Sequence, residues 1–157
     1  MRRMLLLFPL VLAVTAVAAF GADNTLGTWK VNMAKSKYSP GPMPLKSYTA
    51  VRESAPGGVK VTITGERTDG TAINASYTAK YDGTPVAVSG SGTPYDTIAL
   101  KQVDANTVDA VGTRKGSKYN VTFKNVVAKD GKSMTTSGKG TDENGASVNL
   151  TLVYDKQ

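Results

Sequence analysis

The sequence predicts an all-β protein, a single antiparallel up-and-down β-barrel of about eight to ten strands. Three observations predict it. Between Lys46 and Tyr154, strand-length segments alternate with short turns at roughly ten- to fifteen-residue intervals. Many of the turns contain Asp-Gly or Asn-Gly, which supply the positive φ angles of primed hairpin turns. Most segments alternate apolar and polar residues, as expected of a meander that closes on itself and so protects its outermost strands.

The N-terminal segment, residues 1–21, is predicted to be a secretory signal peptide. Two arginines precede an apolar run from Leu5 to Val17, and Ala19-Phe20-Gly21 provides a small-x-small cleavage site. Cleavage after Ala22 and an uncleaved anchor are the alternatives. The run is short for a membrane span, so we expect a periplasmic or secreted protein with no stable membrane insertion after cleavage. Residues 22–157 then form one domain.

The first strand candidate covers residues 28–32 and is followed by the longest interruption of the pattern, from Met33 to Lys46. Asn32 is suited to cap a single helical turn that extends through Lys37. Three prolines then favour an extended connector. A loop of this length is expected to act either as a lid over one mouth of the barrel or as a structural strap.

Nine further strand candidates are separated by turn signals: 47–53, 59–67, 72–81, 86–89, 97–103, 108–114, 119–128, 133–139 and 146–154. Their period-two alternation gives the sheet one inward and one outward face. The clearest inward residues are Val59, Val61, Ile63, Ile73, Ala75, Tyr77, Ala79, Tyr81, Tyr119, Val121, Phe123, Val127, Val148, Leu150, Leu152 and Tyr154. The stretch Ser89-Gly90-Ser91-Gly92 is interpreted as a flexible hairpin loop, because no helix follows that would present amides to a phosphate.

The composition removes most enzyme chemistry. The chain has no histidine and no cysteine, so the commonest general base, the thiolate nucleophile and the usual zinc ligands are missing. The strand acids Glu53, Glu66 and Asp109 have no evident partner for carboxylate catalysis. We therefore expect no enzyme activity, no cofactor and no metal site. A hydrolase or isomerase inside the barrel is the least favoured interpretation.

The chain is basic, with 19 Lys and Arg residues against 12 Asp and Glu. Removal of the two signal-peptide arginines leaves 17 basic residues and a net charge of +5. No run of like charge exceeds two residues, so the charge indicates solubility, or else attraction to an anionic surface. Basic clusters interleaved with aromatic residues are missing, so we expect no nucleic-acid partner.

The inward faces mix small and large side chains. Ala75, Ala79, Ala110, Gly112 and Gly138 lie among tyrosine, phenylalanine and leucine. In a barrel of eight or more strands, small interior residues leave room for a ligand. They also allow neighbouring large side chains to interdigitate and fill the core. The sequence leaves both possibilities open.

The two ends of the domain resemble a known group of proteins. Gly27-Thr28-Trp29-Lys30 and Val153-Tyr154-Asp155-Lys156 are similar to the first and last strands of the lipocalin and fatty-acid-binding barrels. Lys35 to Pro42 is similar to small exported bacterial proteins described as lipocalin-like. The resemblance implies that Trp29 plugs the closed end of the barrel, and that a basic residue on a late strand, here Arg114, stacks on it.

The same resemblance implies an Arg-x-Tyr pair that binds a ligand carboxylate. Tyr154 matches the tyrosine of this pair, but Leu152 takes the place of the arginine. Without that guanidinium a buried carboxylate has no evident partner. A neutral or weakly polar ligand is therefore favoured.

The leading functional prediction is an exported binding protein that sequesters or carries a small hydrophobic molecule inside the barrel. The residues predicted to contact this ligand are Tyr77, Tyr119, Phe123, Leu150, Leu152 and Tyr154, with tyrosine hydroxyls that orient it. The alternative is a non-catalytic structural or protein-interaction module of the cell envelope with a filled barrel. Its partner would be an envelope protein or an anionic surface that meets outward-facing lysines.

Overall fold

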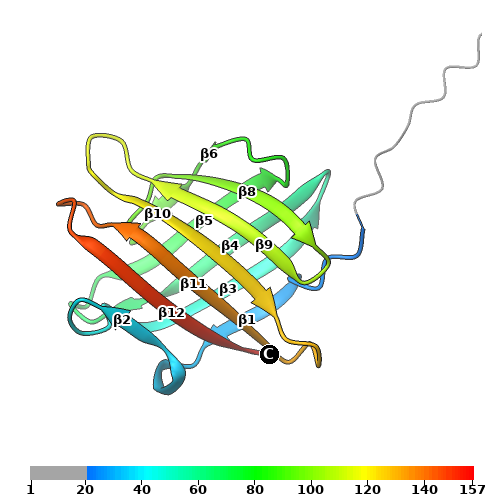
Figure 1. Ribbon diagram of the computed structural model, residues 1–157, viewed down its shortest axis with the longest axis horizontal. Coiled ribbons are helices and arrows are strands. Elements are labelled where there is room, and N and C mark those ends of the chain that lie inside the picture. Colours follow the sequence, from blue (N-terminus) through cyan, green and yellow to red (C-terminus); the bar gives the residue numbers. More distant parts are fainter. Residues whose placement is uncertain (1–20) are drawn as a thin grey trace, which may run out of the picture.

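The computed structural model describes residues 21–157. The predicted signal peptide, residues 1–21, lies outside the described residues apart from Gly21. The described chain forms one sheet of twelve antiparallel strands, wrapped into a nearly closed barrel (Figure 1). The predicted fold class is therefore confirmed. Within the described residues, no helix is long and apolar enough to cross a bilayer.

The elements in chain order are β1 (Gly27–Val31), the 3₁₀ turn η1 (Met33–Lys35), β2 (Lys37–Ser39), β3 (Leu45–Ala55), β4 (Gly58–Arg67), β5 (Ala72–Lys80), β6 (Val86–Ala87), β7 (Ser89–Ser91), β8 (Thr97–Asp104), β9 (Thr107–Thr113), β10 (Asn120–Val127), β11 (Ser133–Thr141) and β12 (Ser147–Lys156). Sequential long strands are hydrogen-bonded neighbours from β3 to β5 and from β8 to β12. Strand β1 lies between β12 and β3 and joins the two halves.

The remaining gap in the barrel lies between β5 and β8, where the chain changes partners. Strand β6 pairs with β8, and after Val88 the chain pairs with β5 as β7. The interpretation of residues 89–92 as a flexible loop is therefore wrong for Ser89–Ser91. Glycine is needed there for close approach, because a Cβ on Gly90 would lie 2.1 Å from the carbonyl oxygen of Asn74. At the other end of the same gap, Asp82 bridges to Lys101.

The Asp-Gly and Asn-Gly turns differ from the predicted primed type. No residue other than glycine has a positive φ in the described chain, whereas a type I′ turn needs two such residues. At Asp69-Gly70, the Gly70 amide donates to the Arg67 carbonyl at 3.1 Å, and Gly70 has φ +85°. The Asp69 carboxylate accepts a hydrogen bond from the Thr71 amide at 2.9 Å. This is a type I turn followed by a left-handed glycine, held by the aspartate side chain.

The segment after β1 is partly as predicted. Asn32 caps η1 by accepting a hydrogen bond from the Lys35 amide at 3.3 Å. The helical turn ends at Lys35, however, and β2 follows, with Tyr38 opposite Leu150 of β12. Pairing with β12 makes this part of the segment a short additional strand of the wall, and its Tyr38 lines the barrel interior. Beyond it, Met43 and Pro44 lie over the barrel interior.

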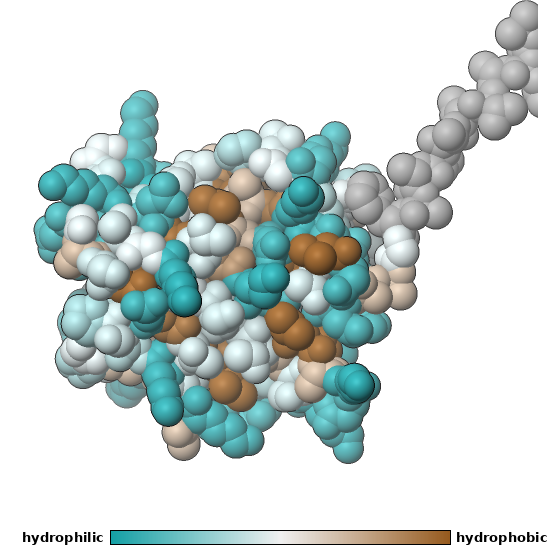
Figure 2. All heavy atoms as spheres, viewed as in Figure 1, coloured by the Kyte–Doolittle hydropathy of each residue, from teal (hydrophilic) through white to brown (hydrophobic). Residues whose placement is uncertain are grey.

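The predicted alternation is confirmed along the walls. Every second residue of β5 from Ile73 to Ala79 is buried, while most of the residues between them are exposed. The interior contains one large apolar cluster around β4, β5, β8 and β9, a second around Trp29, and a third formed by Tyr119, Val121 and Val148. Figure 2 shows mainly polar side chains on the outer face, with apolar residues scattered among them. The large exposed apolar side chains among the described residues are Val103, Val111 and Val126.

Candidate functional site

The barrel encloses a cavity of about 630 Å³. This volume equals that of roughly twenty water molecules in the liquid and lies in the range of small-molecule sites. Of the two arrangements that the sequence left open, the hollow barrel is the one found. The mouth of the cavity lies at the turns that follow β4, β9 and β11, where Asp69, Arg114 and Glu143 line it.

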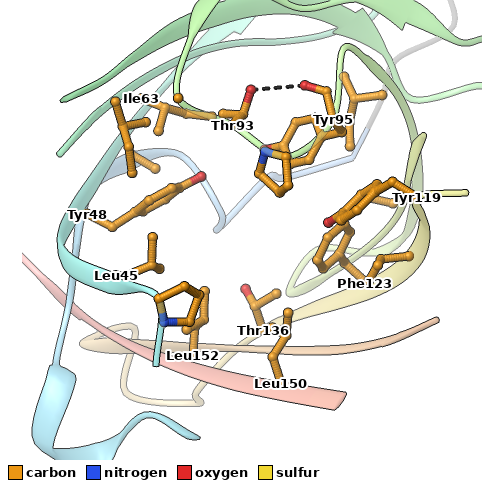
Figure 3. A pocket seen from close by; sticks show the side chains of 18 of the residues that line it. Leu45, Tyr48, Ile63, Thr93, Tyr95, Tyr119, Phe123, Thr136, Leu150 and Leu152 are labelled. Atoms are coloured by element: carbon orange, nitrogen blue, oxygen red, sulfur yellow. Dashed lines mark hydrogen bonds between the residues drawn. The ribbon is translucent and has the colours of Figure 1, made fainter. Parts of the chain in front are cut away.

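All six residues that the sequence predicted as ligand contacts line this cavity. Tyr77 projects from β5 and Phe123 from β10, and Tyr119 immediately precedes β10. Leu150, Leu152 and Tyr154 belong to β12. In Figure 3, Tyr119 and Phe123 face Leu45 and Tyr48 across the open space. Leu150 and Leu152 lie below them.

Several further lining residues were missed. Tyr48 and Arg52, four residues apart on the inward face of β3, line the cavity, and Tyr95 reaches it from the loop before β8. The rings pack edge to face, with Tyr48 and Tyr154 centroids 6.2 Å apart and Tyr95 and Phe123 centroids 6.2 Å apart. The period-two alternation of β3 could have placed Tyr48 and Arg52 on the inward face. Tyr95 lies in a loop, where no such alternation indicates which way a side chain points.

The tyrosine hydroxyls of the wall are neutral at physiological pH. Burial raises the pKa of Tyr48 and of Tyr95 well above 10, and the nearby tyrosine hydroxyls strengthen the effect for Tyr48. Burial also raises the pKa of Tyr77. These side chains therefore offer uncharged donors to the cavity.

Two polar side chains on the wall already satisfy one another. Thr136 is buried and donates to the Asn125 side-chain oxygen at 2.6 Å. The Asn125 side-chain nitrogen donates to the Val108 carbonyl at 3.0 Å. Both residues line the cavity, so this patch provides a polar surface without an unpaired charge.

The floor of the cavity contains a guanidinium. Arg52 is only 6% exposed, and its Nε donates to the Thr25 hydroxyl at 3.2 Å while Nη2 donates to the Tyr81 hydroxyl at 3.4 Å. Asp23 in turn accepts hydrogen bonds from the hydroxyls of Thr25 and Tyr81. The segment before β1 is thus bonded to the interior through a chain of four polar side chains.

Trp29 lies at this closed end, fully buried, and its Nε1 donates to the Thr25 carbonyl at 2.8 Å. The cation above its ring is Lys156, whose Nζ lies 5.1 Å from the ring centroid. The assignment of Arg114 to this position is wrong. Arg114 follows β9 at the mouth, the opposite end of the barrel, where it pairs with Glu143 at 2.7 Å.

The acids considered for catalysis lie away from the cavity. Glu53 and Glu66 pair with surface lysines, and Asp109 lies 3.7 Å from the Lys124 ammonium. None of the three lines the cavity. Within residues 21–157, no three acidic side chains gather into a group that could hold a metal ion.

The comparisons add no family. The chain matches no protein-family model, and no curated protein matches it. The barrel and its cavity are therefore the observations on which a function is proposed.

Proposed function

We propose that the protein is an exported, lipocalin-like binding protein that sequesters or carries a small hydrophobic molecule inside the barrel. The observation that carries the proposal is the cavity of about 630 Å³, open at one end and lined mainly by apolar and aromatic side chains. A pocket of this size and lining, with a few polar groups, is typical of small-molecule sites.

Burial of apolar ligand surface would provide most of the binding free energy. At about 25 cal/mol per Å², a ligand that buries roughly 300 Å² of apolar surface gains about 7 kcal/mol. Loss of translational freedom offsets part of this gain. The cavity walls are already in place, so ordering of the protein offsets little of the binding free energy. Tyrosine hydroxyls such as that of Tyr77 would orient polar atoms of the ligand.

Neighbouring residues of β9 allow a matched test. Ala110 is 4% exposed and lines the cavity, whereas Val111 is 39% exposed on the outer face. In titrations of lipid-stripped protein with a neutral, apolar naphthylamine dye, we expect saturable one-to-one binding. Ala110→Phe should weaken it about tenfold or more, because the added ring occupies ligand space. Val111→Phe should leave it unchanged.

Circular dichroism confirms that both variants are folded before they are compared. Mass spectrometry of the protein purified from its export compartment, after denaturation, provides a second readout in the form of a co-purified apolar molecule. A wild-type protein that takes up no dye and releases no such molecule would contradict the proposal. So would a folded Ala110→Phe variant with unaltered dye affinity.

A further inference from the structure

The Arg52 side chain is incompletely paired for a buried charge. A guanidinium has five N–H donors, and Arg52 uses two nitrogens, each toward a neutral hydroxyl. No carboxylate of the described chain lies within ion-pair distance of it. Because a buried charge is costly unless it is paired and hydrogen-bonded, this arrangement leaves room for an anionic partner.

The nearest internal counter-charge is already committed elsewhere. Asp23 accepts hydrogen bonds at Oδ1 from the amide and the hydroxyl of Thr25, at 2.9 and 2.6 Å, and at Oδ2 from the Tyr81 hydroxyl. Thr25 and Tyr81 therefore stand between Asp23 and Arg52. They position the guanidinium from one side without neutralising it.

The free side of Arg52 faces the cavity. Arg52 lines it, together with Tyr77 and Tyr154. Arg52, Val61 and Tyr77 are register partners across β3, β4 and β5, so Arg52 and Tyr77 flank Val61 on the same inward face. The positive charge of Arg52 opposes the rise that burial causes in the pKa of Tyr77 and Tyr154. The guanidinium thus lies within electrostatic range of both hydroxyls.

We propose that Arg52 binds a carboxylate at the buried end of an otherwise apolar ligand, with the Tyr77 hydroxyl as an additional donor. This inference rests on the proposed function, because it concerns the same cavity. A single guanidinium balances the one charge of a carboxylate. A phosphate monoester carries nearly two negative charges and would leave an unbalanced charge in the apolar floor.

The test compares a long-chain carboxylic acid with the primary alcohol of the same chain, by displacement of the neutral dye at neutral pH. Wild-type protein should bind the acid about tenfold or more tightly than the alcohol, since hydrogen bonds to a charged group are lost with the alcohol. Arg52→Gln should abolish this preference and leave the affinity for the alcohol within about twofold. Lys80→Gln, which removes an exposed charge from β5, should keep it.

Arg52→Gln also removes the bonds to Thr25 and Tyr81, so Tyr77→Phe provides a second variant that leaves those bonds intact. It should reduce the affinity for the acid severalfold and spare the alcohol. Equal wild-type affinities for acid and alcohol would overturn the inference. So would a preference retained in folded Arg52→Gln, or tighter binding of the phosphate monoester of the same chain. If the dye still binds in those cases, the proposed carrier function stands. If the dye does not bind at all, both the carrier function and carboxylate binding by Arg52 are contradicted.

Discussion

Replacement of Thr25 by valine tests the network at the closed end of the barrel. Thr25 is 0% exposed, and its hydroxyl donates to Asp23 and accepts from Arg52. Valine keeps the shape and removes both bonds. Each bond to a charged group contributes about 1.5 to 3 kcal/mol. Asp23 retains the Thr25 amide as a donor, so we expect a loss of about 3 kcal/mol of unfolding free energy.

Urea unfolding provides the assay, followed through the fluorescence of Trp29, the only tryptophan and a fully buried one. With a urea dependence of about 2 kcal/mol per M, the midpoint should fall by about 1.5 M. The control is Thr25→Ser, which keeps the hydroxyl and loses one methyl group, at a cost of about 1 kcal/mol. If valine were as stable as wild type, or serine more damaging than valine, the hydrogen-bonded floor described here would be refuted.

Two further predictions concern the walls and the turns. Because burial holds the pKa of Tyr48 and Tyr95 above the ordinary value of 10.0, the folded state binds their protons more tightly than the unfolded state does. Their contribution to the free energy of unfolding should therefore be fully present below pH 10 and decrease above it. Tyrosinate absorbance should rise together with the loss of far-ultraviolet circular dichroism. Gradual ionisation without unfolding would contradict this. Gly58→Ala places a Cβ 2.0 Å from the Ala79 carbonyl oxygen and should cost about 3 kcal/mol. Gly131→Ala meets no atom within 4 Å at a φ of +68° and should cost about 1 kcal/mol, so thermal midpoints in the reverse order would count against the close β4–β5 contact.

The sequence was sufficient for the fold where alternation is long. Strand β5 has four inward residues in nine positions, and a one-residue slip would turn all of them outward, so its register is strongly specified. Strands β2 and β7 are three residues each, too short to show a period. Their pairing depends on distant strands, β12 and β5, and local propensity carries no information about that.

The candidate site was predictable from the sequence only for residues on strands with clear alternation. Tyr77 and Leu152 followed from alternation, because an inward residue of a hollow barrel lines the cavity. Arg52 lies at an equally inward position of β3, two residues after Ala50, but buried arginine is rare, and Arg52 was not among the predicted inward residues. The cation over Trp29 was misplaced for a different reason. Lys156 comes next to Trp29 through the pairing of β1 with β12, and a contact between opposite ends of the chain is not visible in local sequence.

Both described termini lie at the end of the molecule remote from the cavity mouth. The carbonyl of Ala22 accepts a hydrogen bond from Gln102 near the β8–β9 turn, and the amide of Gln157 donates to Thr28 of β1 (Figure 1). An affinity tag or a surface linker attached at either terminus would therefore hold the barrel base-down. Its opening would point into solution, so the attachment would leave the cavity mouth unobstructed.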